Sequence, residues 1–326
     1  MMNRRKFLLA AAASVAALGA TKGGANGAEL SSNERVDRAL AGRDVDRPPF
    51  SFWHHFGLKT PEEHAQRTLE FHRLYGTDIV KVMSDFPYPK PAGKWYELEV
   101  VDNPFPQQIR ALELVRDGLH GKAYFIETVF NPWNVAEKLS SKEEVRKLKE
   151  TNPGALLHAL DVITESQIRH AKRAFRAGAS GVLFSVANAN ETELPLADYV
   201  QFSRPSDKKF LAGIAGAKLN ILHLHVKPAY LDQFQDFAFP ILNYSDQVSG
   251  IPFHTVRSQY PSAVLAGGID EVNYKSLTPD QIRAQWKATA EAAGPKFILT
   301  PGCSVPNDSS PTELARLPSV LGIKTA

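Results

Sequence analysis

The sequence has only one cysteine, Cys303, in 326 residues. A lone thiol cannot form an intramolecular disulfide, so the chain is not a disulfide-stapled scaffold. The sequence also lacks a dinucleotide-binding or P-loop glycine fingerprint. The pair Gly267-Gly268 is too short for a phosphate loop, although it permits close approach of the backbone to a ligand. These absences exclude the nucleotide-binding classes that such fingerprints identify.

A marked excess of one charge sign is also absent. The chain has 38 Lys and Arg against 35 Asp and Glu, and four of the basic residues precede the first acidic one, Glu29. Residues 29–326 therefore have 34 basic and 35 acidic residues, a net charge of −1. Without a basic stripe, we expect neither a nucleic-acid partner nor stable membrane association of this part of the chain.

The first 28 residues differ from the rest. A charged start with adjacent Arg4 and Arg5 is followed by an apolar run over 8–20 and by small residues at 25–28. This pattern predicts a signal peptide of twin-arginine type, and hence a periplasmic or secreted protein. The apolar run is short for a membrane span. An uncleaved membrane anchor is the alternative.

Eight apolar runs of strand length alternate with helical patterns after the leader. The predicted strands are 50–54, 78–84, 123–130, 181–186, 220–226, 241–245, 263–269 and 297–303. The predicted helices include 31–41, 61–75, 107–117, 156–177, 253–260 and 278–294, with further helical patterns within 195–216, at 232–238 and from 311. This alternation predicts a single-domain α/β protein over residues 29–326, a (β/α)₈ TIM barrel. A doubly wound open sheet is the alternative. Residues 94–106 and 140–153 are expected to be insertions.

A parallel barrel places its site where the strands end. At those ends we predict catalytic roles for Asp85, His54 and His55, with a loop cap as the alternative for Asp85. We predict substrate-binding roles for Trp53, Asn131, Ser185, Asn243, Gly267 and Gly268. His64 and His72 lie on a predicted helix and are expected at the surface.

The predicted fifth strand carries His223 and His225. Side chains two residues apart on a strand share a face, so both imidazoles can reach one metal ion. If the fold brings the end of the eighth strand close, Cys303 completes a His-His-Cys metal site. The alternative is two core histidines and a buried thiol.

The C-terminal part resembles a known family. The motifs Val264–Asp270 and Phe297–Cys303, the helix between them, Asn307-Asp308 and Pro311 resemble the C-terminal signature of the uroporphyrinogen decarboxylase superfamily. Arg47-Pro48-Pro49 and Asp78–Asp85 are similar to its N-terminal strands. The resemblance covers about residues 34–322 and implies a TIM barrel, in agreement with the strand pattern.

The superfamily has two chemical branches. Its porphyrinogen decarboxylases use no cofactor and hold substrate carboxylates with two arginines after the first strand. This sequence has His54–Leu58 there, although Asp85 matches the decarboxylase aspartate. Its corrinoid:thiol methyltransferases hold zinc with a His-x-Cys on strand five and a cysteine after Pro-Gly on strand eight. Here the corresponding residues are His223, His225 and Cys303, so the resemblance implies a zinc site with histidine in place of one cysteine.

The zinc interpretation predicts an exported enzyme that activates a thiol or similar nucleophile, as methyltransferases do. A neutral imidazole in place of a thiolate would leave the metal a stronger Lewis acid, which would favour hydrolysis or another reaction. The alternatives are a cofactor-free decarboxylase of a porphyrinogen-like substrate and a non-catalytic exported binder of a metal or tetrapyrrole. In each case we expect a small-molecule ligand, and a homodimer is possible.

Overall fold

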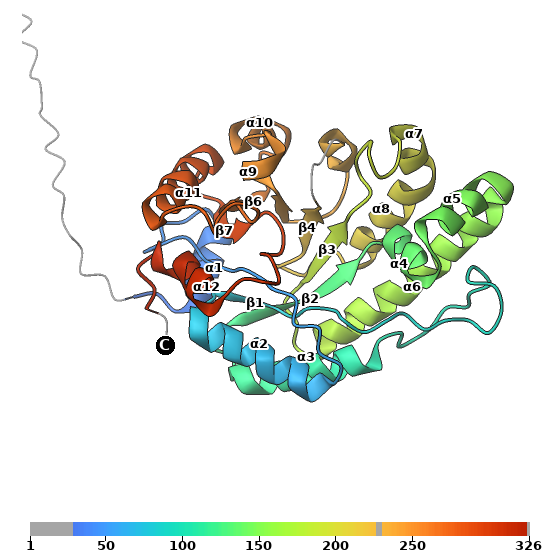
Figure 1. Ribbon diagram of the computed structural model, residues 1–326, viewed down its shortest axis with the longest axis horizontal. Helices are drawn as coiled ribbons and strands as arrows, with labels where there is room; N and C mark the ends of the chain where they lie inside the picture. The colour runs from blue at the N-terminus through green and yellow to red at the C-terminus, as the bar shows by residue number, and fades with distance from the viewer. Residues whose placement is uncertain (1–28, 226–229, 325–326) are drawn as a thin grey trace, which may run out of the picture.

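The computed structural model describes residues 29–225 and 230–324 (Figure 1). The predicted leader, residues 1–28, and Val226, the last residue of the predicted fifth strand, lie outside the described residues. No helix in the described part of the chain is long and apolar enough to cross a membrane.

Seven parallel strands form one sheet, and each strand pairs with the next in sequence. The strands are β1 (Ile79–Lys81), β2 (Tyr124–Phe130), β3 (Val182–Val186), β4 (Ile221–Leu224), β5 (Ile241–Tyr244), β6 (Val264–Ile269) and β7 (Phe297–Pro301). The sheet is curled, with helices around its outside (Figure 1). All carboxyl ends of the strands therefore lie at one rim, as the predicted barrel requires.

The first predicted strand, 50–54, is reduced to a single parallel bridge between Phe50 and Leu299. The Leu299 amide donates to the Pro49 carbonyl at 2.8 Å, and the Ser51 amide donates to the Leu299 carbonyl at 3.1 Å. On the other side, the Asp78 amide donates to the Phe50 carbonyl at 2.7 Å. Residues 49–51 thus link β7 to the residue that precedes β1. The described residues therefore contain seven of the eight predicted strands, and the linking segment takes the place of the first.

The helices surround the sheet. They are α1 (Ser32–Leu40), α2 (Pro61–Tyr75), α3 (Pro106–Leu119), α4 (Pro132–Leu139), α5 (Lys142–Thr151), α6 (Pro153–Arg176), α7 (Leu196–Asp198), α8 (Arg204–Gly213), α9 (Asp246–Ser249), α10 (Phe253–Gln259), α11 (Pro279–Ala293) and α12 (Pro311–Ser319). A π-helical turn, Tyr199–Ser203, joins α7 to α8, and Leu231–Phe234 is a 3₁₀ turn. The expected insertion at 140–153 forms an additional helix, α5, which Ser141 caps and which precedes the long helix α6. Residues 94–105 are irregular, as predicted.

Alternation of side chains along the strands produces two apolar layers. One cluster contains at least one inward residue from each of the seven strands. These residues are Ile79, Ile126, Leu183, Ile221, Ile241, Val264, Ala266 and Ile298. The larger cluster packs the opposite faces of the strands against the helices. The inner cluster fills the barrel below the rim, so the rim is closed from beneath by packed side chains.

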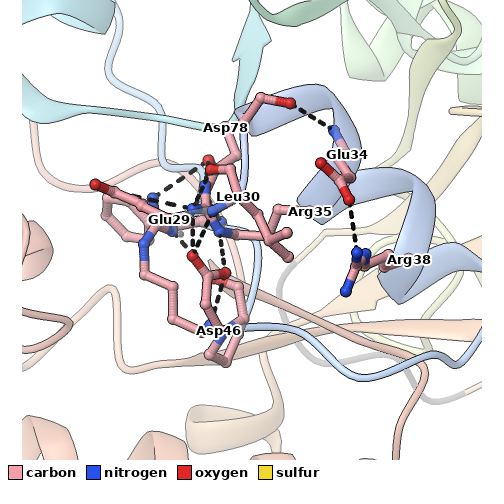
Figure 2. A network of polar contacts seen from close by, with 11 residues as sticks. Glu29, Leu30, Glu34, Arg35, Arg38, Asp46 and Asp78 are labelled. Atoms are coloured by element: carbon pink, nitrogen blue, oxygen red, sulfur yellow. Dashed lines mark hydrogen bonds and ion pairs between the residues drawn. The ribbon is translucent and has the colours of Figure 1, made fainter. Parts of the chain in front are cut away.

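A cluster of charged residues lies at the amino end of β1 (Figure 2). Arg35 of α1 is fully buried and donates to Asp46 at 2.7 Å and to Asp78 at 2.6 Å. Asp78 also accepts from Arg47 at 2.5 Å and from the Phe50 amide at 2.9 Å. This cluster therefore anchors both α1 and the linking segment 49–51.

Candidate metal centre and adjoining cavity

The three predicted metal ligands meet at the rim. His223 lies in β4, His225 directly follows β4, and Cys303 follows β7. One ligand atom from each of the three lies within 4.8 Å of the others. Cys303 Sγ is 3.0 Å from His225 Nδ1. Strands β4 and β7 are not neighbours, so the curl of the sheet brings these side chains together across the mouth.

Asn243 of β5 fixes the orientation of His223. Asn243 is fully buried, and its amide nitrogen donates to the Ala266 carbonyl, Thr300 Oγ1 and the Pro301 carbonyl. Its Oδ1 must therefore be the acceptor toward His223 Nδ1, at 2.5 Å. This contact assigns the proton to Nδ1 and leaves the Nε2 lone pair of His223 for a ligand. Asn243, predicted to bind substrate, has its amide engaged inside the protein.

Glu271 supports the turn that carries Cys303. Ser245 donates to one carboxylate oxygen of Glu271, and the Gly302 amide donates to the other at 3.1 Å. A Cβ on Gly302 would lie 2.2 Å from Ser245 Cα, so only glycine permits this backbone approach. Glu271 is buried, and burial raises the pKa of its carboxyl. The sequence pattern did not single out this residue.

All three candidate ligands are neutral without a cation. Burial raises the pKa of the Cys303 thiol to about 11. Burial, and then the neighbouring His225, lower the pKa of His223 to about 3, and burial lowers the pKa of His225. The imidazole lone pairs are therefore available to a ligand. A metal ion would displace the thiol proton, because metal ligation requires the thiolate.

This set of donors fits a zinc ion. Histidine nitrogen and cysteine sulfur are standard zinc ligands, and three protein ligands leave a fourth position open in a tetrahedral site. Tetrahedral bonds of 2.0–2.3 Å separate ligand atoms by roughly 3.3–3.8 Å. The ligand atoms here, which lie within 4.8 Å of one another, need to approach by at most about 1.5 Å to reach that separation.

A small cavity of about 60 Å³ lies beside the three residues. It is lined by Trp53 and Ser185, both predicted substrate-binding residues, and by Lys81 of β1. Lys81 is buried, with Nζ 2.6 Å from Met83 Sδ and 5.5 Å from the centre of the Trp53 ring. Burial lowers the pKa of Lys81 to about 7, although Cys303, Glu127 and Asp85 oppose that shift.

A larger cavity of about 370 Å³ adjoins the small one, and His55, Thr128 and Phe130 line both. Asp85 lies on its wall with Oδ2 3.0 Å from His64 Nε2 and Oδ1 3.7 Å from His55 Nδ1. Burial raises the pKa of Asp85, but the nearby His55 and the hydrogen bond with His64 outweigh it, so the pKa is well below its usual range. The expectation that His64 lies at the surface is wrong, because its side chain is fully buried against Asp85. His72 is half-buried.

The remaining predicted residues serve the framework. His54 Nε2 lies 3.1 Å from the Asn307 carbonyl. Asn131 is fully buried, caps α4 and donates to Asn188 and Asp207. A Cβ on Gly267 would meet Asp246 Oδ1 at 2.4 Å. Gly268 has φ +99° and donates from its amide to Asp246 Oδ1 at 2.9 Å. These two glycines let β6 approach α9.

The fold and the rim together define an α/β barrel-like protein with a candidate His-His-Cys metal centre at the carboxyl ends of its strands. The chain belongs to the uroporphyrinogen decarboxylase (URO-D) family, whose sequence profile matches residues 81–321. This finding confirms the resemblance seen in the sequence. A comparison with curated protein sequences found no match.

Solved structures share the fold. A methyltransferase from Methanosarcina mazei superposes with a TM-score of 0.72 at 18% sequence identity, covering 90% of this chain and 98% of that one. A B12-independent methionine synthase from Shewanella sp. W3-18-1, in complex with selenomethionine, has a TM-score of 0.59 at 11% identity, covering 84% and 91%. At these identities the likeness establishes the fold alone.

Proposed function

We propose that this protein is a zinc-dependent enzyme of the methyltransferase type, in which His223, His225 and Cys303 hold the metal. The observation that carries the proposal is the convergence of the three ligand atoms within 4.8 Å at the rim. Membership of an enzyme family and the fold shared with a methyltransferase and a methionine synthase support it. Zinc, when bound, supplies a Lewis acid that stabilises a thiolate or similar nucleophile at neutral pH.

The residues of the chain have distinct tasks in this proposal. Asn243 holds the His223 ring with its Nε2 lone pair free, and Glu271 holds the Gly302 amide so that Cys303 stays at the rim. His55 lines both cavities and lies beside Asp85, so it is placed to carry a proton to or from a substrate. His64 orients Asp85 from the buried side.

The cofactor-free decarboxylase is less well supported. Its resemblance rested on Asp85, which does line the larger cavity. However, no arginine is among the residues that line this cavity or the smaller one. The cations on these walls are lysines, namely Lys81, Lys90 and Lys138, which cannot grip a carboxylate through two parallel hydrogen bonds as an arginine does.

The test is metal analysis of the purified protein. We expect about one zinc per chain, and we expect a thiol titrated into the zinc-loaded protein to release a proton, since the zinc-bound form of a thiol is the thiolate. Calorimetry in two buffers of different ionisation heat measures that proton. Absence of zinc after growth with added zinc, together with no uptake by the purified protein, would refute the proposal.

We also propose that residues 1–28 export the protein by the twin-arginine route. The support is the sequence pattern around Arg4 and Arg5. Replacing both arginines by lysine preserves the charge but removes the recognised pair, so the protein should be retained inside the cell. Cell fractionation with immunoblotting measures this, and normal export of the double-lysine variant would contradict the proposal.

A further inference from the structure

The larger cavity has features that identify the kind of molecule it takes. Its walls are mainly apolar and aromatic, formed by Phe86, Phe105, Val129, Phe130, Val135 and Leu139. Its volume is about 370 Å³. A cavity of roughly 150 Å³ accommodates benzene, so this one has room for a body of about 10–15 non-hydrogen atoms. Apolar walls of this kind bind an apolar, ring-containing body.

Two cations on the wall, Lys90 and Lys138, form no ion pair with a carboxylate among the described residues. Lys138, in the last turn of α4, has its Nζ 3.2 Å from the centre of the Phe130 ring. By contrast, Lys142 and Lys149 on the next helix bind Glu193 and Asp198 at 2.5 Å. Lys138 lines the cavity but is also exposed to solvent. Partial desolvation by the surrounding protein lowers its pKa to about 8, and the charge of Asp85 opposes that shift. Because Asp85 is held by His55 and His64, it forms no ion pair with Lys138 within 4.0 Å.

We propose that the larger cavity binds a compact organic acid, with its apolar, ring-containing body against the aromatic walls and its carboxylate on Lys138. This inference rests on the proposed function, because it takes the larger cavity to be the substrate site beside the metal. The acid group lies at the Lys138 end of the molecule. The other end extends past Phe130, which lines both cavities, toward His223, His225 and Cys303.

Electrostatics favours this arrangement over a neutral ligand. A carboxylate at Lys138 replaces the ring face as the main partner of the ammonium, and a charge-assisted hydrogen bond is roughly twice as strong as a neutral one. The ring of Phe130 remains as a wall for the apolar body. Lys90 also lines the cavity, so the two lysines together outweigh the single negative charge of Asp85 on the same wall.

The experiment is a calorimetric titration with two matched ligands, 2-naphthoate and its neutral isostere 2-naphthamide, at pH 7. We expect the wild-type protein to bind naphthoate about tenfold more tightly than naphthamide. Lys138→Met keeps the apolar stem of the side chain, and it should weaken naphthoate about tenfold while leaving naphthamide within twofold. Lys147→Met, an exposed lysine on α5, is the control for loss of one charge and should change neither ligand by more than twofold.

Several results would overturn the inference. Equal binding of the two ligands by the wild type would remove the role of charge, and no binding of either would remove the aromatic site. Equal weakening of both ligands by Lys138→Met would indicate a structural role, and circular dichroism monitors the fold of each variant. If Lys138→Met does not fold, Lys138→Gln is used instead.

The titrations are repeated after removal of metal with a chelator. Naphthoate binding without any zinc uptake would refute the proposed function but support the organic-acid site. Zinc uptake without naphthoate binding would refute the organic-acid site but support the proposed function. A direct bond between the naphthoate carboxylate and zinc would appear as chelator-sensitive binding that Lys138→Met leaves unchanged, which also contradicts the inference.

Discussion

Two clusters of polar side chains, each built around buried groups, lie at opposite ends of the strands. The amino-end cluster of Arg35, Asp46, Asp78 and Arg47 pairs every charge with an opposite charge (Figure 2). The rim cluster of His223, His225 and Cys303 contains neutral groups. Their hydrogen bonds are the one between His223 and Asn243 and the one between His225 and Cys303. A cluster whose charges are all matched stabilises the fold, whereas neutral donors with free lone pairs are a site for a ligand. Both clusters contain buried groups, so burial does not distinguish the structural cluster from the ligand site. The distinction is whether each polar group already has a partner within the protein.

The sharpest way to break the amino-end cluster is Asp78→Ala. Removal of this carboxylate leaves Arg35 buried with one partner fewer and removes the acceptor of the Phe50 amide. We expect a loss of about 3–5 kcal/mol in the free energy of unfolding, measured by denaturant titration. Zinc content of the folded fraction should not change. A loss below about 1 kcal/mol would mean that the cluster behaves like a surface ion pair.

The rim cluster is broken by Cys303→Ser. A hydroxyl is a poor replacement for a thiolate as a zinc ligand, so zinc affinity should fall by about 100-fold or more. This loss exceeds the roughly 10–100-fold that follows removal of a residue that only hydrogen-bonds to a ligand. Competition with a chromogenic chelator measures the affinity. His225→Cys is the matched variant and should keep the metal, because a thiolate is also a zinc ligand. Unchanged affinity in Cys303→Ser would remove Cys303 from the metal site.

Asn243→Leu tests the support of the rim. Without its acceptor, the Nδ1 proton of His223 no longer fixes the ring, and we expect zinc affinity to fall about 10–100-fold. Asn220→Leu is the control, because Asn220 is also buried beside β4 and bonded to the Val182 amide and the Ile214 carbonyl. The two variants should lose similar stability, but only Asn243→Leu should lose zinc affinity. Equal zinc affinities would contradict the positioning role.

The smallest effect is expected at the edge of the amino-end cluster. Arg38 and Glu34 form an exposed ion pair at 2.6 Å on α1, and Figure 2 shows it beside the buried charges. An exposed pair of this spacing contributes about 0.3–0.5 kcal/mol. Arg38→Ala should therefore lower the free energy of unfolding by no more than that. A loss of several kcal/mol would show that the exposed pair is coupled to Arg35.

Much of the fold could be predicted from the sequence because strands and helices have different hydrophobic periods. Seven of the eight predicted strands are present in the described residues, with shorter bounds. The length of the first strand was overestimated because residues 50–54 are mostly apolar. Hydrophobic periodicity does not reveal that only Phe50 forms a bridge with a residue of β7, Leu299. Helices α4 and α5 were missed, although Asn131-Pro132 and Ser141 with Glu144 are ordinary start signals.

The sequence by itself determined that His223 and His225 share a face, because alternation along a strand is a local property. Only the tertiary structure decided that Cys303 reaches His225, since this depends on the curl of the whole sheet between β4 and β7. It also decided that Asn243 holds His223, that Glu271 holds Gly302, and that His64 is buried against Asp85. Partners far apart in sequence meet through packing, and no spacing along the chain specifies which lone pairs that packing leaves free.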